Sequence, residues 1–464
     1  VGVGEGTWPT IRETLFKIGI SESDLVTECG ATFKQGSQFV NWRNTQQDEH
    51  YYHPFTAPRG FGQIDLATYW QSDNKKAFAE SVSHQPQLCD LGLAPKTMAD
   101  KEYQGFANYG YHLDAGKFAE LLKRHTIDNL RVNHVIGTVS DVKLDKNEQV
   151  KSLCLTSNEV IEGDFFVDCS GFAGLLINKT YNIPFVECDD ILLTDRAIAV
   201  QVPYEEEQDD IACQTISTAQ QAGWIWDIGL FNRRGVGYVY SSKFESEQSA
   251  LDTLANYLNK DAQELTPKNI SFQAGHRQKF FHKNCVAIGL SAGFLEPLEA
   301  SALMLVEISA KFIAEQLPPN KSLLSVVEER FNSTFLYRWQ KIIDFLKLHY
   351  LLSERTEPFW QASRDGKHTP NSLIELMKLW SYRSPQDHDF DSNFEVFPAA
   401  SYQYVLYGMG FSSNFSLSLS GQTKETEAHK LFVLNEKAIS QMLQRAPKHR
   451  ELINRIQAHG LSKI

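Results

Sequence analysis

The sequence predicts a mixed α/β or α+β fold with a largely helical C-terminal region, on three observations. Short runs that alternate apolar and polar residues recur through the middle of the chain, which indicates β-strands. Segments with apolar residues three and four positions apart lie around these runs, which indicates amphipathic helices. Helical patterns dominate beyond residue 300. Strands that alternate with helices and then give way to them are typical of mixed folds.

The helices are predicted from their start and stop signals. The first begins near Thr10, where Pro9 stands at the entrance and Glu13 completes a candidate capping box. The second begins after Asp114, whose carboxylate can accept hydrogen bonds from the first free N–H groups. Three further helices are expected over residues 248–259, 300–316 and 323–353.

The strands are predicted from alternation and from the turn residues at their ends. Strand-like segments cover residues 31–42, 131–138, 150–156, 164–168, 191–243 and 285–289. From the whole pattern we expect two units: a discontinuous body over residues 1–320 and a mostly helical region over residues 321–464.

The composition argues against several classes of protein. The chain has 464 residues, of which 42% are hydrophobic, and a formal net charge of -12. An acidic chain lacks the electrostatic footprint of a nucleic-acid-binding protein. Its apolar runs fall short of the ~18 residues of a membrane span. The seven cysteines are widely spaced without a CxxC pair, so no metal site or disulfide framework is indicated, and free thiols fit a cytoplasmic location.

Three segments have patterns suited to a cofactor site. At residues 166–172 a hydrophobic strand ends in Asp168 and runs into small residues, where the backbone can approach a dinucleotide closely. At residues 288–300 a second strand runs into a helix start, where free N–H groups favour anions. At residues 223–229 two tryptophans stand two positions apart, so a strand presents both rings on one face. Each segment alone also fits an ordinary turn, helix start or aromatic core cluster.

Taken together, these segments resemble the flavin-dependent tryptophan halogenases. The Trp-x-Trp-x-Ile element of that family appears at residues 224–228, and its glutamate-bearing helix start appears at residues 294–299. Further matches in chain order are Gly-Val-Gly-Glu at residues 2–5, Phe-Lys at 33–34, Phe-Val-Asn-Trp at 39–42, Tyr-His-Pro-Phe at 52–55, His-Tyr at 349–350 and Pro-Phe-Trp at 358–360. The resemblance implies a monooxygenase-like flavin-binding fold in the body. It also implies an enzyme that uses FADH2, oxygen and bromide or chloride to form hypohalous acid, which halogenates an indole-type ring.

The resemblance implies two catalytic side chains. Lys34 would hold and polarise the hypohalous acid, and its apolar neighbours suit a partly buried ammonium group. Glu299 would stabilise the cationic ring intermediate and remove its proton, with Glu296 as the fallback. Trp224 and Trp226 would separate the flavin from the substrate and so prevent direct oxygen transfer.

The resemblance also implies the remaining contacts. The flavin would contact Gly2, Gly4, Glu5, Asp168, Gly171, Gly289 and Leu290. The halide would lie at Ser301 and Ala302, and the aromatic substrate would lie against His53, Phe55 and Phe397. No second glycine-rich fingerprint for a nicotinamide cofactor is present, so a separate flavin reductase would supply FADH2. The resemblance is also compatible with a homodimer.

The chain departs from the family pattern at several places. The Gly-x-Gly-x-x-Gly βαβ unit does not occur, so we expect this N-terminal unit to be missing from the chain. Gly229 replaces the proline after Trp-x-Trp-x-Ile, and Ala302 replaces a glycine beside the halide. Phe397 stands where a tryptophan is expected, and no tyrosine-rich lid is evident between residues 384 and 397. We therefore expect indole to be preferred over free tryptophan.

Two other functions stay open on the sequence alone. A flavin-dependent aromatic monooxygenase shares the strand end at Asp168 and the reduced-flavin chemistry, but it does not need Lys34, Glu299 or the paired tryptophans. A non-catalytic flavin-fold protein has no reason to retain both Lys34 and Glu299. Dependence of the product on halide distinguishes a halogenase from a hydroxylase.

Overall fold

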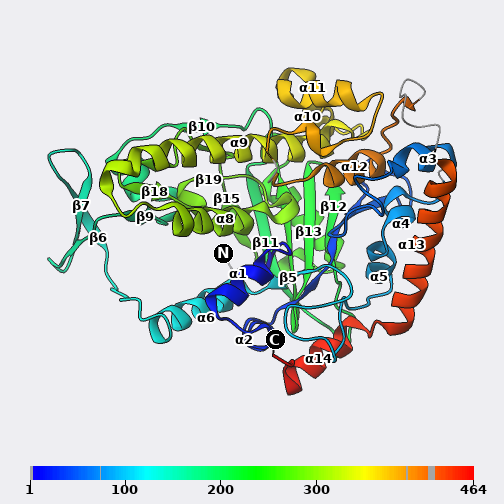
Figure 1. The fold of residues 1–464 in the computed structure, drawn as a ribbon, viewed down its shortest axis with the longest axis horizontal. Coiled ribbons are helices and arrows are strands. Elements are labelled where there is room, and N and C mark those ends of the chain that lie inside the picture. Colours follow the sequence, from blue (N-terminus) through cyan, green and yellow to red (C-terminus); the bar gives the residue numbers. More distant parts are fainter. Residues whose placement is uncertain (1–3, 74, 393–394, 416–423, 464) are drawn as a thin grey trace.

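A seven-stranded sheet forms the centre of the computed structural model, which describes residues 4–73, 75–392, 395–415 and 424–463 (Figure 1). Its strands lie in the order β15 (Lys268–Ser271), β11 (Arg196–Pro203), β14 (Arg233–Tyr240), β13 (Gly223–Gly229), β12 (Thr215–Gln220), β3 (Gly36–Val40) and β4 (His50–Pro54). Neighbouring strands are antiparallel except β12 and β3, which are parallel. The sheet predicted within residues 191–243 is confirmed, and it continues into strands from the start of the chain.

Four three-stranded sheets surround the central one. They are β1 (Glu5–Gly6), β5 (Gly110–Leu113) and β2 (Thr32–Lys34); β10 (Phe185–Glu187), β16 (Gly275–Arg277) and β19 (Gly293–Phe294); β17 (Phe281–His282), β18 (Cys285–Ala287) and β9 (Phe166–Asp168); and β6 (Val139–Leu144), β7 (Val150–Leu155) and β8 (Val160–Glu162).

The strand predicted over residues 31–42 is two strands, β2 and β3, which belong to different sheets. The chain changes sheet at Gln35, whose N–H donates to the carbonyl of Cys213 and whose carbonyl accepts from the N–H of Phe55. This change of sheet places Lys34, the last residue of β2, at the junction between the two sheets.

Helices cover the sides and both ends of the central sheet (Figure 1). They are α1 (Ile11–Ile18), α2 (Glu22–Cys29), α3 (Leu66–Asp73), α4 (Phe78–Val82), α5 (Gln85–Asp90), α6 (Ala115–Asp128), α7 (Glu247–Leu258), α8 (Ser301–Gln316), α9 (Leu324–Leu351), α10 (Pro358–Ser363), α11 (Asn371–Trp380), α12 (Ala399–Gly408), α13 (Glu425–Arg445) and α14 (His449–His459). The helices predicted after Asp114 and over residues 248–259, 300–316 and 323–353 are confirmed. The carboxylate of Asp114 accepts hydrogen bonds from two N–H groups of the first turn of α6.

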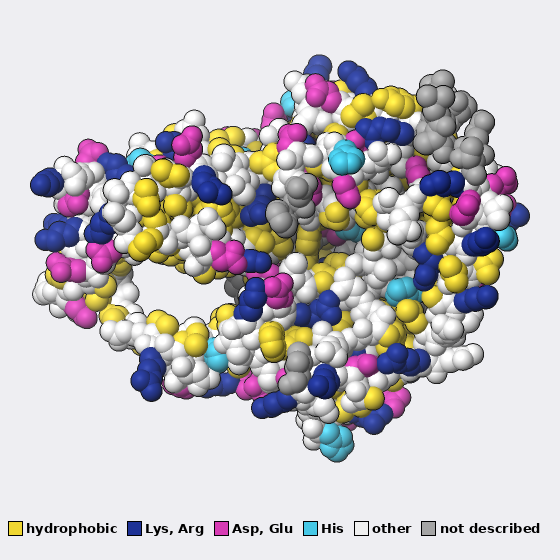
Figure 2. Space-filling model, viewed as in Figure 1, with side chains coloured by type: hydrophobic (Ala, Val, Ile, Leu, Met, Phe, Trp, Pro, Cys, Tyr) yellow, Lys and Arg dark blue, Asp and Glu magenta, His cyan; other side chains and the backbone are white. Residues whose placement is uncertain are grey.

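Two local predictions were wrong. Thr10 itself has helical φ and ψ, so its side chain makes no capping hydrogen bond and no capping box forms. Residues 131–138 form no strand, because no described strand pairs along them; only near their end does Thr138 accept a hydrogen bond from the N–H of Thr156, just beyond β7. They run as an exposed connection between α6 and the hairpin β6–β7, and Ile136 is 88% exposed. Figure 2 shows an opening through the molecule beside this connection.

The largest apolar core lies between the central sheet and the helices that follow residue 320. Trp224 of the sheet and Trp339, Phe345 and Trp360 of the helices belong to this one cluster. Residues 342–350 of α9 are all buried, so this part of the helix passes through the interior rather than over the surface. Among the described residues, no helix is long and apolar enough to cross a membrane.

Candidate active site

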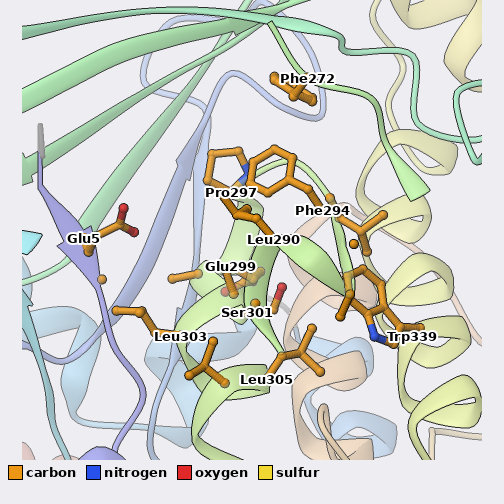
Figure 3. Close-up of a pocket in the computed structure, with 18 of the residues that line it drawn as sticks. Glu5, Phe272, Leu290, Phe294, Pro297, Glu299, Ser301, Leu303, Leu305 and Trp339 are labelled. Atoms are coloured by element: carbon orange, nitrogen blue, oxygen red, sulfur yellow. The ribbon is translucent and has the colours of Figure 1, made fainter. Parts of the chain in front are cut away.

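A strained turn places Glu299 in front of α8. Glu299 and Ala300 have φ of 63° and 55°, the left-handed region that is costly for residues with a side chain. Two hydrogen bonds hold this turn: the indole of Trp8 donates to the Glu299 carbonyl at 2.8 Å, and the N–H of Ala300 donates to the carbonyl of Pro297 at 3.1 Å. Glu299 is 6% exposed and belongs to the lining of a cavity (Figure 3).

The carboxylate of Glu299 is held mainly by one of its two oxygens. Its Oε1 accepts from Nδ1 of His53 at 2.6 Å and lies 3.6 Å from Nε2 of His349. Its Oε2 accepts from the hydroxyl of Ser37 at 3.3 Å. Burial alone raises the pKa of this carboxyl, but His53, His349 and Lys34 outweigh burial and hold the pKa below its usual value. The Glu299 carboxyl group is therefore ionised, and its Oε2 has fewer protein partners than its Oε1.

Lys34 is a buried cation in the lining of the same cavity. It is 1% exposed, and its Nζ lies 5.4 Å from the centre of the Phe55 ring. Gly6 leaves room for the ammonium group, because a Cβ at that position would lie 3.2 Å from the Lys34 Nζ. Burial lowers the pKa of Lys34 to about 8, although the negative charge of Glu299 opposes this change. The ammonium group therefore titrates close to neutral pH.

The cavity has a volume of about 390 Å³, in the range of small-molecule sites, and is lined largely by apolar side chains. Four glycines belong to its lining: Gly4 and Gly6 from the β1 segment and Gly289 and Gly293 around β19. Figure 3 shows Glu5 projecting from the β1 side and Trp339 at the other end of the view. Burial raises the pKa of Glu5 to about 7.

The predicted flavin contacts divide into residues that line the cavity and residues of the turn after β9. Gly4, Glu5, Gly289 and Leu290 line the cavity, and Gly2 lies outside the described residues.

Asp168 and Gly171 do not line this cavity. The Asp168 carboxylate accepts from the N–H groups of Ser170, Leu176 and Ile177, so it anchors the turn after β9. Phe172, one residue beyond Gly171, does reach the cavity wall.

The predicted halide residues lie at the first turn of α8. Ser301 and Ala302 both line the cavity, and the described structure gives this helix no side-chain cap. Uncapped N–H groups and the positive end of the helix dipole attract anions. The position therefore suits a halide ion.

The two predicted tryptophans lie on β13, one behind the other. Trp226 lines the cavity, whereas Trp224 is 1% exposed and packs edge-on against it at 6.4 Å between ring centres. On the neighbouring strand β14, a Cβ on Gly237 would lie 2.3 Å from the Trp226 ring, so only glycine leaves space for that ring.

Glu296 supports Trp224 and does not line the cavity with Glu299. Its Oε2 accepts from the Trp224 indole at 3.1 Å, from the Tyr350 hydroxyl at 2.8 Å and from the Thr194 hydroxyl at 2.9 Å. Burial raises the pKa of this carboxyl. Of the two candidate glutamates, only Glu299 lies within reach of Lys34 and the cavity.

The predicted substrate residues His53, Phe55 and Phe397 are not among the residues that line this cavity. Nε2 of His53 lies 2.9 Å from the hydroxyl of Ser401 on α12, so this ring bridges α12 and Glu299. Phe397 stacks on Phe345 at 3.8 Å and meets Trp8 edge-on at 4.8 Å. These contacts connect the helical region to the cavity wall.

Sequence reasoning did not assign roles to Tyr51, His349 or Ser401. His349 was matched only as part of a motif, and the other two had no local signal. Tyr51 and His349 are 298 positions apart in the chain, and His53 and Ser401 are 348 positions apart. Only the folded chain brings these residues together.

This fold has an apolar cavity whose lining includes a buried lysine, a buried glutamate and a tryptophan, and comparison with known proteins identifies its class. The family model for tryptophan halogenase matches residues 1–424. The structure superposes on that of a tryptophan halogenase from Shewanella frigidimarina NCIMB 400 with a TM-score of 0.97 and 42% identity, over 100% of this chain and 90% of the other. It superposes on BrvH, a flavin-dependent halogenase from Brevundimonas sp. BAL3, with a TM-score of 0.86 and 28% identity, over 98% and 92% of the two chains.

Sequence comparison gives the same result. The chain is 33% identical to tryptophan 7-halogenase RebH of Lentzea aerocolonigenes, over 88% of this chain and 82% of the relative. The chain belongs to the tryptophan halogenase family, and it is a flavin-dependent halogenating enzyme.

Proposed function

We propose that this enzyme halogenates an indole-type aromatic compound, with Lys34 and Glu299 as its catalytic residues. The observation that carries the proposal is that a buried ammonium and a buried carboxylate line one cavity. FAD would lie against Gly4, Glu5, Gly289 and Leu290. When bound as FADH2, the cofactor would react with oxygen and halide to supply hypohalous acid, which then reacts with the aromatic ring.

Each side chain has a defined part in the substitution. The Lys34 ammonium would donate a hydrogen bond to hypohalous acid and a proton to the departing hydroxide, which leaves as water. Glu299 would stabilise the cationic ring and accept the ring proton through Oε2. That proton then restores the Lys34 ammonium, so arene and hypohalous acid yield haloarene and water.

The other predicted residues complete this proposal. Ser301 and Ala302 would hold bromide or chloride at the start of α8, and Trp226 would screen the flavin from the ring. Residues 321–464 would supply the substrate side of the site, and residues 1–320 the flavin side. A separate flavin reductase would deliver FADH2. A homodimer is compatible with this arrangement.

The test uses the enzyme with a flavin reductase, FAD, bromide and indole, with brominated product measured by mass spectrometry. We expect Lys34→Ala to abolish halogenation while flavin binding is retained. We expect Glu299→Gln to reduce the rate about 100-fold, the usual effect of removing a positioned base. Normal product from Lys34→Ala would refute the role of Lys34.

Lys347→Met is the matched control. This second buried lysine donates to the carbonyls of Ile191 and Ser363 and does not line the cavity. Halogenation per folded enzyme should therefore persist in Lys347→Met. Equal loss in Lys347→Met and Lys34→Ala would show that removal of any buried lysine inactivates the protein.

A further inference from the structure

His349 faces the candidate base from inside α9. Its ring is fully buried, and its Nδ1 lies 2.6 Å from the hydroxyl of Tyr51 on β4. Its Nε2 is buried without a hydrogen-bond partner and lies 3.6 Å from Oε1 of Glu299. A buried imidazole nitrogen without a partner is costly, so its position next to a carboxylate needs an explanation.

The hydrogen bond from Tyr51 selects the tautomer of His349. Burial raises the pKa of the Tyr51 hydroxyl well above its usual value, so the hydroxyl keeps its proton. Burial also lowers the pKa of His349 to about 3, so the ring is neutral near pH 7 and has one N–H. If Tyr51 donates to Nδ1, that N–H is on Nε2. The Nε2–H then points at the Glu299 carboxylate, whereas the other tautomer would turn a lone pair toward it.

We propose that Tyr51 and His349 are positioning residues that keep Glu299 ionised and oriented for proton removal. This inference rests on the proposed function of Glu299 as the base. Tyr51 fixes the tautomer, His349 presents its N–H to Oε1, and Oε2 is left to meet the substrate. His349 therefore acts through Glu299 and has no contact of its own with the reacting ring.

Four side chains face the Glu299 carboxylate, and His349 is the one that approaches it from α9. The other groups that face the carboxylate are Lys34 from β2, Ser37 from β3 and His53 from β4. His53 is connected outward to Ser401, whereas His349 is connected to Tyr51. Two imidazoles thus approach the same oxygen from α9 and from β4, and each is oriented by a hydroxyl behind it.

Removal of this N–H should make Glu299 easier to protonate. An N–H near a carboxylate favours the ionised form, so its loss raises the pKa of the carboxyl. Activity then falls most at acidic pH, where the base becomes protonated, and recovers at higher pH. A purely structural defect lowers activity by a similar factor at every pH.

The test compares Tyr51→Phe, His349→Phe and His349→Gln with the unchanged enzyme. Infrared difference spectra during acid titration report protonation of buried carboxyls, and the band that disappears in Glu299→Gln identifies Glu299. We expect the midpoint of this band to move to higher pH in Tyr51→Phe and His349→Phe. His349→Gln should restore part of the change, because its amide can still present an N–H.

The pH profile of kcat/KM should shift in the same way: more in Tyr51→Phe and His349→Phe than in His349→Gln. At the acidic end we expect His349→Phe to lose about tenfold more activity than at the alkaline end, because a buried carboxylate that loses a nearby N–H is protonated more easily. Tyr350→Phe is the matched control, since its buried hydroxyl bonds Glu296 instead of Glu299. The acidic limb of the kcat/KM profile of Tyr350→Phe should therefore have the same midpoint as that of the unchanged enzyme.

The two readouts separate this inference from the proposed function. An unmoved Glu299 band in both Tyr51→Phe and His349→Phe overturns the inference, whatever the activity. An unmoved acidic limb in an active His349→Phe enzyme overturns it as well. Absence of any halogenation by the unchanged enzyme overturns the proposed function, while a shifted Glu299 band still supports the contact between His349 and Glu299.

Discussion

Lys34 shows at the scale of one residue how a buried charge costs stability. The side chain is 1% exposed, and among the described residues its ammonium makes no hydrogen bond to a protein group. Lys347 is just as buried, but it donates to two carbonyl oxygens. A buried charge without such partners destabilises the folded state. The position of Lys34 therefore makes sense for a group whose partner is a reactant.

Lys34→Met should stabilise the protein, by about 1–3 kcal/mol of unfolding free energy at pH 7. Burial lowers the pKa of Lys34 from 10.5 to about 8, so the unfolded chain binds more protons between these values. The folded wild type therefore gains stability as pH rises from about 8 to 10.5. The advantage of the variant should be complete below pH 8 and should shrink above it. Urea unfolding at pH 7 and pH 9.5 measures both effects.

The matched variant Lys347→Met should behave in the opposite way. It leaves the carbonyls of Ile191 and Ser363 without their donor, so it should lower the unfolding free energy at pH 7. A Lys34→Met protein that is less stable than wild type at pH 7 would contradict the argument about the unpaired charge.

The pair of strands β13 and β14 determines the position of Trp226. A Cβ on Gly237 would lie 2.3 Å from the Trp226 ring, so Gly237→Ala must displace the indole from the cavity wall. We expect a loss of about 1–3 kcal/mol of stability from this overpacking. We also expect hypohalous acid to escape, so that a soluble 1,3-diketone trap is halogenated at the expense of indole. The ratio of the two products measures the escape.

Gly366→Ala provides the comparison for this prediction. Nothing lies within 4 Å of a Cβ at Gly366, so this substitution adds the same methyl group without displacing a ring. Its product ratio and stability should match those of the wild type. An unchanged ratio in Gly237→Ala would show that the position of Trp226 does not control the escape.

The elements with strong local signals could be predicted from the sequence, and the others depended on distant partners. Asp114 caps α6 as expected, because an N-cap acts within its own first turn. The alternation in residues 131–138 was misleading, since a strand also needs a neighbour. Lys34 and Glu299 were predicted through motifs, and the structure places both in the lining of one cavity. The support for Glu299 from Tyr51, His349 and Ser401 joins segments about 300 positions apart, which no local pattern encodes.

At the scale of the whole molecule, the site forms where the central sheet meets the helical region. The sheet supplies Ser37, His53 and Trp226, and the buried half of α9 supplies His349. A single apolar core joins these two parts, so their relative position is held by packing as well as by hydrogen bonds. The geometry around Glu299 therefore depends on the fold as a whole.

Three charged groups on the helical side are paired with the protein itself. Arg383 donates to the carboxylate of Asp389, which also accepts from the Trp380 indole. The carboxylate of Glu395 accepts from the hydroxyl of Tyr337. Arg383, the only Lys or Arg described between residues 383 and 397, is therefore already engaged and is not a free cation for the carboxylate of an amino acid.

We predict that the enzyme prefers indole to L-tryptophan, because the carboxylate of free tryptophan would lose water without gaining a cationic partner, at a cost of several kcal/mol. A ring held mainly by aromatic contacts is oriented loosely, so substitution should occur at C3, the most nucleophilic carbon of indole. The measurement is kcat/KM with bromide for both compounds, together with the position of the halogen. Tryptamine and indole-3-propionate each remove one charge and should lie between the two. A higher value for L-tryptophan, with one product on the benzo ring, would mean that the protein binds its amino and carboxyl groups through residues other than Arg383, Asp389 and Glu395.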